Sequence, residues 1–180
     1  MKIYTIGHST RPFDEFIDIL VENHIHCLVD VRSYPGSNKY PQYNKAVLRD
    51  NLADYGIKYY HIADLGGRRH NKISYDTDIE VKAFSSYAEY MLTDEFKEGL
   101  TELKKIARKC KTVYMCSEAV WWRCHRRMIS DQLEFEGWKV FHLGLEKKPV
   151  RHTIWNLARF DKKTKKVYYD KIFYEIKRIQ

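Results

Sequence analysis

The chain has 180 residues, 44% of them hydrophobic, which is enough for one globular domain with a sizeable core. Its formal net charge of +8 and its aromatic content of 14% favour a polyanionic partner such as a nucleotide or a nucleic acid. No apolar run approaches the roughly 20 residues of a membrane span, and Met1 is not followed by a signal peptide. We therefore expect a cytoplasmic protein without a membrane partner.

The cysteines carry a separate inference. The sequence contains four of them, Cys27, Cys110, Cys116 and Cys124, in a chain too large to depend on a disulfide framework. Disulfides persist mainly in secreted proteins, and no secretory signal opens this sequence. We therefore expect no disulfide among them.

A strand and an amphipathic helix are predicted at the amino terminus. Residues 2–7 have an apolar strand pattern. Thr10 is a candidate N-cap for the helix that follows, and Pro12 suits its first turn. Apolar residues then recur at i, i+3, i+4, i+7 and i+8, which places them on one helical face: Phe13, Phe16, Ile17, Leu20 and Val21.

A second strand and a long loop come next. Residues 26–31 are a nearly continuous apolar run, as expected of a strand buried on both faces of a parallel sheet. Asp30 is the conspicuous polar residue near its end. Residues 33–44 combine proline and glycine with tyrosines, which predicts a loop. A connection of this length is longer than most and is often functional.

The middle of the chain continues the alternation of helices and strands. Residues 44–56 predict a helix, and residues 57–62 predict a third strand. The segment after this strand places the glycine pair Gly66 and Gly67 beside Arg68. Glycines allow backbone amides to approach an anion closely, so this segment is a candidate anion-binding loop.

Two helices, two strands and a last helix fill the second half of the core. Apolar spacing predicts one helix over residues 84–91 and another that begins near Thr93. Residues 112–115 predict a fourth strand, and a helix then runs to Gly137. Residues 139–143 predict a fifth strand.

This alternation predicts right-handed βαβ units and therefore an α/β fold. We expect a mostly parallel sheet of about five strands with helices on both faces, arranged as a Rossmann- or flavodoxin-like three-layer sandwich. Residues 1–180 are assigned to a single domain, with its core at about residues 2–148. The remaining residues, about 149–180, form a carboxy-terminal appendage for which a hairpin and irregular structure are both open.

Polar residues follow every predicted strand. In parallel α/β sheets, ligands bind outside the carboxyl ends of the strands. We therefore expect one composite site built from the residues at or just after these ends: His8, Ser9, Asp30, Arg32, Gly66, Arg68, Cys116, Glu118 and His142.

The turn before the last predicted helix concentrates reactive side chains. Residues 115–127 contain two cysteines, a carboxylate, an imidazole and three arginines: Cys116, Glu118, Arg123, Cys124, His125, Arg126 and Arg127. Cations are unfavourable near the positive end of a helix dipole. The arginines therefore predict a compensating anion, either Glu118 or a bound phosphate or carboxylate.

The chain resembles the domain of unknown function 488 family in four successive motifs. They are Tyr4-Thr5-Ile6-Gly7-His8-Ser9, Asp30-Val31-Arg32-Ser33, Leu65-Gly66-Gly67-Arg68, and Cys116-x-Glu118 followed by Cys124-His125-Arg126. Two departures are Ser117, where members more often have alanine, and Val120-Trp121 in place of a commoner Leu-Pro. The resemblance implies a compact α/β domain with its site at these motifs.

A metal site is the first chemical alternative. Cys116, Glu118, Cys124 and His125 are a possible ligand set for zinc. The cysteines lack the two-residue spacing of common zinc knuckles, and the adjacent Cys124 and His125 should point in different directions. We therefore expect no metal and no other cofactor, with zinc as the weaker alternative.

Thiol chemistry is the second alternative. A cysteine at a helix N-terminus among arginines has a lowered pKa and becomes a nucleophile. The anion-binding loop of phosphatases and sulfurtransferases needs a cysteine, five residues and then an arginine. The corresponding position is Trp122 when counted from Cys116 and Ser130 when counted from Cys124, so that loop does not fit. A thiol-dependent transferase or hydrolase, and a packing role for both cysteines, stay as alternatives.

Acid/base hydrolysis is the leading hypothesis. Asp30 and Glu118 come from separate strand ends, where one carboxylate can activate water while His8 or His125 protonates a leaving group. Anion and base binding is assigned to Ser9, Arg32, Gly66, Gly67, Arg68, Arg123, Arg126, Arg127 and Tyr40.

We accordingly predict an enzyme that cleaves an N-glycosidic or phosphoester bond of a nucleotide or nucleic acid, a reaction that would suit DNA repair. A non-catalytic nucleic-acid binding module is the alternative. A purely structural ion pair between Asp30 and Arg32 is a second alternative for those two residues.

Overall fold

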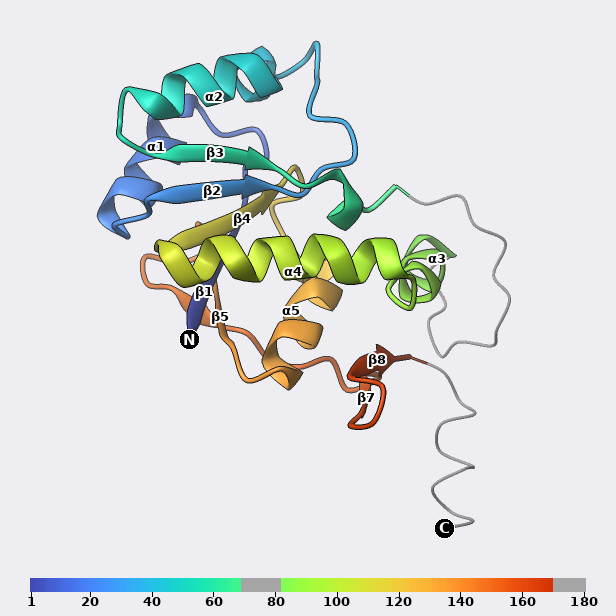
Figure 1. The fold of residues 1–180 in the computed structure, drawn as a ribbon. Helices are drawn as coiled ribbons and strands as arrows, with labels where there is room; N and C mark the ends of the chain where they lie inside the picture. Colours follow the sequence, from blue (N-terminus) through green and yellow to red (C-terminus); the bar gives the residue numbers. More distant parts are fainter. Residues whose placement is uncertain (69–81, 170–180) are drawn as a thin grey trace, which may run out of the picture.

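The computed structural model describes residues 1–68 and 82–169 and contains a six-stranded sheet (Figure 1). Its strands are β1 (Lys2–Gly7), β2 (Cys27–Asp30), β3 (Lys58–His61), β4 (Thr112–Cys116), β5 (Lys139–Leu143) and β6 (Val150–Arg151). They lie in the order β3-β2-β4-β1-β5-β6. The first five are parallel, and β6 joins the edge antiparallel to β5.

Helices cover both faces of this sheet. α1 (Phe13–Glu22) and α2 (Lys45–Ala53) pack on one face. α4 (Asp94–Lys109) and α5 (Arg126–Phe135) pack on the other, with α3 (Lys82–Tyr90) at the end of α4 (Figure 1). The predicted three-layer α/β sandwich is therefore confirmed, with one antiparallel strand added to the five predicted ones.

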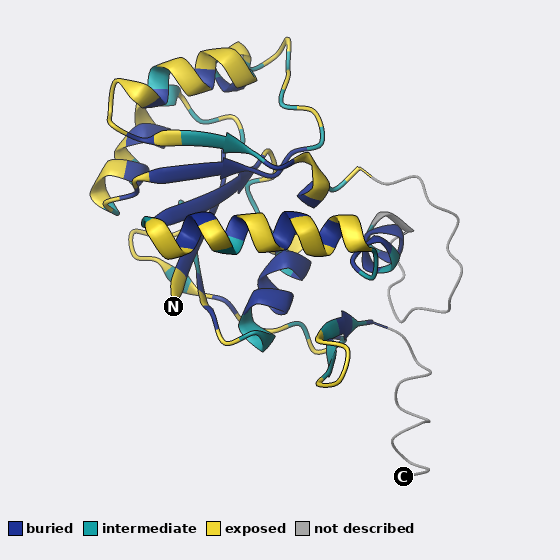
Figure 2. Cartoon of the chain, viewed as in Figure 1, coloured by how far each residue is buried: buried dark blue, intermediate teal, exposed yellow. Residues whose placement is uncertain are grey.

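The hydrophobic core is divided by the sheet into two clusters. One joins α1 and α2 to the sheet and includes Phe16, Leu20 and Leu48. The other joins α3, α4 and α5 to the opposite face and includes Leu103 and Ile129. Figure 2 shows that the central strands are buried, whereas α4 is buried on one side only, as its amphipathic sequence predicts.

Local sequence signals predicted one helix start correctly and one wrongly. α4 begins after Thr93, whose hydroxyl oxygen accepts a hydrogen bond from the Phe96 N–H, as expected of an N-cap. α1 has its N-cap at Pro12, not at Thr10 as predicted. Pro12 has an extended ψ of 148°, so the helical conformation begins only at the next residue.

Residues 150–169 contribute to the same core. After β6, β7 (Arg159–Asp161) and β8 (Lys166–Tyr168) form an antiparallel hairpin. Val167 and Tyr169 are buried against the cluster that contains α4 and α5. Gln132 of α5 bonds the hairpin backbone through the Lys165 carbonyl and the Val167 N–H, which fixes the hairpin on the domain.

The expectation that the chain contains no disulfide is wrong for one pair. Cys27 at the start of β2 and Cys110 just after α4 are bonded to each other across a sequence separation of 83. β2 and β4 are neighbours, and His26 and Cys27 both donate backbone hydrogen bonds to the Lys111 carbonyl. This pairing brings the two cysteines together at the amino-terminal edge of the sheet.

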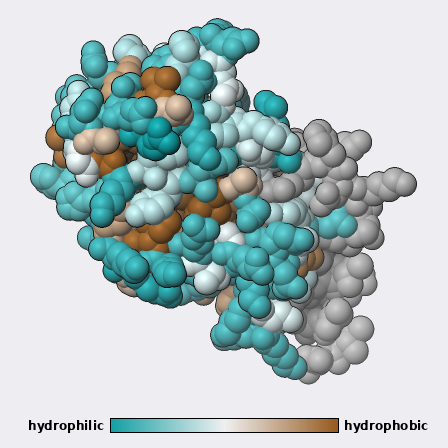
Figure 3. Space-filling model, turned by 45° about the horizontal axis from the view of Figure 1, so that its top comes forward, coloured by the Kyte–Doolittle hydropathy of each residue, from teal (hydrophilic) through white to brown (hydrophobic). Residues whose placement is uncertain are grey.

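The molecular surface is largely polar. The face shown in Figure 3 is mostly hydrophilic and carries separate hydrophobic areas. No helix within residues 1–68 and 82–169 is long and apolar enough to cross a membrane. Two of the exposed large apolar side chains, Tyr34 and Trp122, lie in the loop after β2 and the turn before α5.

Candidate functional site

Backbone hydrogen bonds bring together the carboxyl ends of β1, β2 and β4. The His8 N–H donates to the Cys116 carbonyl at 3.0 Å, and the Ser9 N–H donates to the Ser117 carbonyl at 3.0 Å. On the other side of β4, the Val31 N–H donates to the Met115 carbonyl at 2.9 Å. The residues that follow these strands therefore lie side by side at one edge of the sheet, as predicted from the parallel topology.

A cavity of about 520 Å³ opens at this edge. Its size is in the range of small-molecule sites. The loops after β1, β2, β3 and β4 line it, together with one residue of α3. Its walls are formed by His8, Ser9, Thr10, Arg32, Ser33, Tyr34, Gly36, Ser37, Tyr40, Gly67, Arg68, Phe84, Cys116, Ser117, Glu118, Ala119, Arg123, Cys124 and His125.

Two glycines are required by close packing at this site. A Cβ on Gly7 would lie 1.8 Å from the Glu118 carbonyl oxygen, so a side chain would push the β1 end away from the turn after β4. A Cβ on Gly67 would lie 2.4 Å from Nδ1 of His125. Gly7 thus lets the end of β1 pack against the turn that carries Glu118. Gly67 lets the loop after β3 pack against the His125 ring.

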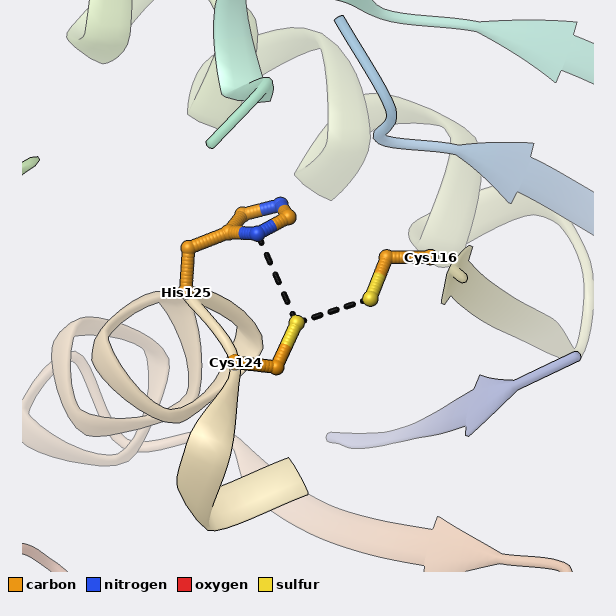
Figure 4. A group of neighbouring side chains, drawn as sticks. All are labelled: Cys116, Cys124 and His125. Carbon is orange, nitrogen blue, oxygen red and sulfur yellow. Dashed lines mark hydrogen bonds between the residues drawn. The ribbon is translucent and has the colours of Figure 1, made fainter. Parts of the chain in front are cut away.

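Cys116, Cys124 and His125 point toward one another (Figure 4), and all three line the cavity. The two sulfur atoms are 2.7 Å apart, and Sγ of Cys124 lies 3.4 Å from Nδ1 of His125. Cys116 ends β4, whereas the other two residues immediately precede α5. Both cysteines are buried and neither is in a disulfide.

The hydrogen bonds of His125 define its tautomer. Nε2 lies 3.2 Å from the Val31 carbonyl oxygen, which can only accept a hydrogen bond. Nε2 therefore carries the hydrogen in the neutral ring, and Nδ1 presents its lone pair to Sγ of Cys124. This arrangement lets His125 accept the thiol proton of Cys124.

Arg126 is a buried cation, with 1% of its surface exposed. Its guanidinium donates to the hydroxyl of Thr5 and to the carbonyl oxygens of Glu118 and Ala119, all of which are uncharged acceptors. Within the part of the chain that the structure describes, no carboxylate forms an ion pair with it. The predicted compensation by the Glu118 side chain is therefore not what holds Arg126.

The thiols next to Arg126 have strongly separated pKa values. Burial by itself raises the pKa of Cys124, but a hydrogen bond from Cys116 and the charge of Arg126 lower it to about 6. Burial and the adjacent Cys124 raise the pKa of Cys116 well above its ordinary value. Burial lowers the pKa of Arg126, whereas the charges of Cys116 and Cys124 raise it, so the guanidinium stays charged.

The opposite shifts favour a single thiolate at this site. Either sulfur can be the donor in the contact between Cys116 and Cys124, and the raised pKa of Cys116 and lowered pKa of Cys124 favour Cys116 as the donor. The negative charge then lies on Cys124, beside the buried Arg126. A thiolate in such an environment is a nucleophile.

One comparison with known proteins identifies the family. The family model described as "Domain of unknown function DUF488" matches residues 12–133, which is more than half of the chain. The chain belongs to this family. No curated protein and no solved structure matches it. The DUF488 match contains the cysteine pair and Arg126, whereas His8 and Ser9 lie just before its first residue.

Within the DUF488 domain, Asp30 and Arg32 form a buried ion pair. Asp30 is fully buried and accepts from Nε of Arg32 at 2.9 Å and from its NH2 group at 2.6 Å. The Tyr59 hydroxyl also donates to the Asp30 carboxylate at 2.8 Å. Asp30 does not line the cavity, so the geometry assigns it to holding Arg32 in place.

His8 borders the cavity as a neutral ring. Burial lowers its pKa to about 4, and the charge of Arg32 contributes to this shift. Nδ1 lies 2.8 Å from the Ser9 carbonyl oxygen and so carries the hydrogen, which leaves Nε2 to accept from Arg32 at 3.2 Å. A ring in this state does not supply a proton to a leaving group near neutral pH.

The remaining predicted site residues divide into those that line the cavity and those that do not. Those that line the cavity are Ser9, Tyr40, Gly67, Arg68, Glu118 and Arg123. Gly66 lies behind the wall, where a Cβ would meet Ser33. Arg127 stacks over the Trp155 ring at 3.8 Å, and His142 lies in a buried chain with His152 and Asp131, so neither reaches the cavity.

Several wall residues were absent from the sequence-based site. Ser33 accepts a hydrogen bond from the Arg68 backbone N–H at 3.1 Å and thereby joins the loops after β2 and β3. Its place directly after Arg32 at a strand end was a signal that could have indicated it. Phe84 and Tyr34 add aromatic side chains to the cavity wall. Phe84 had no such signal, because it belongs to the apolar face of a predicted helix.

The cysteine cluster has a geometry that bears on metal binding. Cys116, Cys124 and His125 each offer one ligand atom, and these atoms lie within 4.8 Å of one another. The argument that the adjacent Cys124 and His125 must point apart is therefore wrong, because the turn before α5 directs both toward one point. The donor types suit a soft cation such as Zn²⁺.

Acid should destabilise the fold through two buried imidazoles. Burial lowers the pKa of His8 to about 4 and that of His142 to about 2. The unfolded chain then binds protons before the folded one, so stability falls as pH drops below about 6.5. We expect a loss of about 2 kcal/mol per histidine between pH 7.5 and pH 5.

Urea unfolding at both pH values measures this effect. His8→Gln and His142→Gln should each reduce the pH dependence, whereas His26→Gln, at an exposed position, serves as the control. Equal pH dependence in all four proteins would contradict the assignment of neutral buried rings.

Proposed function

We propose that this chain is a thiol-dependent enzyme in which the Cys124 thiolate attacks a small anionic substrate. The observation that carries the proposal is the buried Arg126 guanidinium, which forms no ion pair with a carboxylate among the described residues and interacts with the two cavity thiols, Cys116 and Cys124. A buried charge without a counter-ion is strongly unfavourable. A thiolate at Cys124 supplies that counter-ion, so the fold itself stabilises the nucleophile.

The cavity walls support an anionic substrate. Arg68 and Arg123 are exposed cations on the wall, and among the described wall residues Glu118 has the single carboxylate. Arg32 also reaches the wall, but Asp30 neutralises its charge. The two unneutralised guanidinium groups can bind phosphate oxygens at the mouth while the substrate's electrophilic atom approaches Cys124.

Aromatic rings favour a nucleotide-sized substrate. Tyr34, Tyr40 and Phe84 line the same cavity as the arginines. Rings of this kind stack on nucleobases without strong sequence preference. The combination of phosphate-binding cations and stacking surfaces makes a nucleoside phosphate the substrate class that we propose.

The proposed reaction is group transfer or hydrolysis through a covalent thio-intermediate. The Cys124 sulfur forms a bond to the electrophilic atom of the substrate and the leaving group departs. Glu118, an exposed carboxylate on the wall, is the group placed to assist proton transfer to the leaving group or from water. Asp30 has a structural role in this proposal, which replaces the two-carboxylate mechanism suggested by the sequence.

Alkylation of Cys124 tests the nucleophile. We expect its reaction with iodoacetamide to be half-maximal near pH 6, as the lowered pKa requires, with the alkylated peptide identified by mass spectrometry. Cys124→Ser should reduce release of product from a panel of nucleoside phosphates by about a thousandfold or more. A half-maximal pH near 8.5, or full turnover by the serine variant, would refute the proposal.

The wall arginines should determine anion affinity. Arg68→Ala and Arg123→Ala should each weaken nucleoside phosphate binding by roughly fivefold to thirtyfold, the loss of about 1 to 2 kcal/mol for a charged hydrogen bond. Arg49→Ala, which removes an exposed arginine on α2, is the matched control. Calorimetry at constant ionic strength measures the three affinities. Equal affinities in all variants would place the anion elsewhere.

A nucleic-acid partner and a cytoplasmic location are separate proposals. The net charge of +8 favours polyanion binding, which should weaken steeply with added salt. A non-catalytic binding module would be favoured if Cys124→Ser still bound oligonucleotides and the wild-type protein showed no turnover.

The cellular location is tested through the other two cysteines. Free thiols at Cys27 and Cys110 in rapidly alkylated cells would support the cytoplasm, whereas a bridge formed before lysis would point to an oxidising compartment.

A further inference from the structure

The sulfur atoms of the two free cysteines are closer than non-bonded atoms usually are. Their sulfur atoms are 2.7 Å apart, whereas non-bonded heavy atoms usually settle at about 3.5 to 4.0 Å. Cys116 is held by the end of β4, and Cys124 by the turn into α5 (Figure 4). The loop between them passes through the short helix η3 (Trp121–Arg123), so the approach is imposed by the fold on both sides.

The distance between the two sulfur atoms distinguishes a disulfide from a shared zinc ion. A disulfide needs a sulfur separation of about 2.05 Å, so these sulfurs would have to approach by less than 1 Å. A tetrahedral zinc ion with bonds of about 2.3 Å would hold two sulfurs about 3.8 Å apart, which requires them to separate by about 1 Å. The observed contact therefore lies nearer to the disulfide than to the metal site.

We propose that Cys116 and Cys124 form a reversible disulfide that a small hydroperoxide makes and a small thiol reduces, so that the enzyme is switched off by oxidation. This inference rests on the proposed role of Cys124 as the nucleophile. Burial selects the size of the oxidant. Cys116 is 2% and Cys124 5% exposed at the cavity floor, where a hydroperoxide fits and the active site of another protein does not reach.

The chemical steps balance with hydrogen peroxide as the oxidant. The Cys124 thiolate attacks one peroxide oxygen, the S–O bond forms, the O–O bond breaks, and hydroxide leaves and takes up a proton. The Cys116 thiol then attacks the Cys124 sulfenic acid, the S–S bond forms, and water leaves with the Cys116 proton. Two equivalents of a small thiol reverse the reaction and are themselves oxidised to a disulfide.

The other cysteine pair provides an internal reference. Cys27 and Cys110 are bonded at the opposite, amino-terminal edge of the sheet and take no part in the cavity. A Cys27→Ala/Cys110→Ala variant therefore keeps only the two cysteines of interest. Peptide mapping of the wild-type protein distinguishes the two bridges directly.

The experiment treats the reduced full-length protein with one equivalent of hydrogen peroxide and maps thiols by alkylation and mass spectrometry. We expect a Cys116–Cys124 bridge in the wild type and in the Cys27→Ala/Cys110→Ala variant, removed by dithiothreitol with recovery of Cys124 alkylation. Cys116→Ala should accumulate a sulfenic acid at Cys124, trapped by dimedone. Cys124→Ala should form no bridge at Cys116, because the other two cysteines, Cys27 and Cys110, are bonded at the opposite edge of the sheet.

Three outcomes would overturn the inference. The first is equal dimedone trapping at Cys124 with and without Cys116. The second is a bridge that dithiothreitol cannot reduce in the folded protein. The third is a tightly bound equivalent of zinc that protects both thiols from peroxide, shown by metal analysis and by cobalt substitution with sulfur-to-metal absorption bands that His125→Ala weakens.

The result is separable from the test of the enzyme itself. Should Cys124 alkylate with a half-maximal pH near 6 and turn over substrate while no bridge forms, the nucleophile stands and only the switch fails. If Cys124 instead alkylates with the pH profile of an ordinary thiol, the proposed function fails as well. That result does not depend on the outcome of the peroxide treatment.

Discussion

Replacing Arg126 by methionine should move the half-maximal pH for Cys124 alkylation from about 6 to about 8.5 or higher. Arg126 is the buried charge that stabilises the thiolate, and methionine keeps much of its length without the charge. The thiolate fraction at pH 6 should fall about a hundredfold. A thiolate with a higher pKa is intrinsically more nucleophilic, so the rate at one pH falls less than the fraction does.

The measurement is therefore a full pH profile of alkylation and not a single rate. Arg127→Met is the matched control, because the Arg127 side chain stacks on Trp155, and the substitution keeps the backbone hydrogen bond from the Arg127 N–H to the Cys124 carbonyl. Its half-maximal pH should remain that of the wild type. An unchanged profile in the Arg126 variant would mean that Arg126 is not the counter-ion of Cys124, and the main support for the proposed nucleophile would be lost.

Asp30→Ala should lower the free energy of unfolding by about 3 to 5 kcal/mol, as measured by urea titration. The carboxylate is fully buried and holds Arg32 through paired hydrogen bonds. Removing it leaves a buried guanidinium without its counter-ion, and the Tyr59 hydroxyl loses its acceptor as well. The size of this loss reports the cost of an unpaired buried charge rather than the net value of the pair.

A double variant separates this structural role from a catalytic one. Asp30→Ala/Arg32→Met removes both charges and should be more stable than Asp30→Ala alone, since no unpaired charge is left. Its Cys124 alkylation profile should stay close to that of the wild type. Unchanged stability of Asp30→Ala together with lost turnover would instead restore Asp30 to the catalytic mechanism.

Much of the fold was predictable because its signals are local. The apolar period in residues 13–21 and the buried runs at β2 and β4 specify a helix and two strands whatever surrounds them. The parallel alternation then predicts that the strand ends lie at one edge, where the His8 N–H bonds the Cys116 carbonyl.

Pairings between distant residues were not predictable from these signals. The Cys27–Cys110 disulfide depends on β2 lying beside β4, and strand order is set by tertiary packing. Composition favoured unpaired cysteines, but composition carries no information about which two sulfurs the sheet brings into contact. The short turn from β4 to α5 likewise decides that Cys124 and His125 converge with Cys116.

From its sequence the chain was recognisable as an α/β sheet, and the sequence also predicts a polar site at the carboxyl ends of the strands with an anion beside the arginines at the start of α5. The burial of Arg126 and the pairing of Asp30 with Arg32 became visible only in the folded chain. The physical reason is that burial and counter-ion choice depend on packing between distant segments. A residue's type states its charge, but its neighbours in space determine where that charge is neutralised.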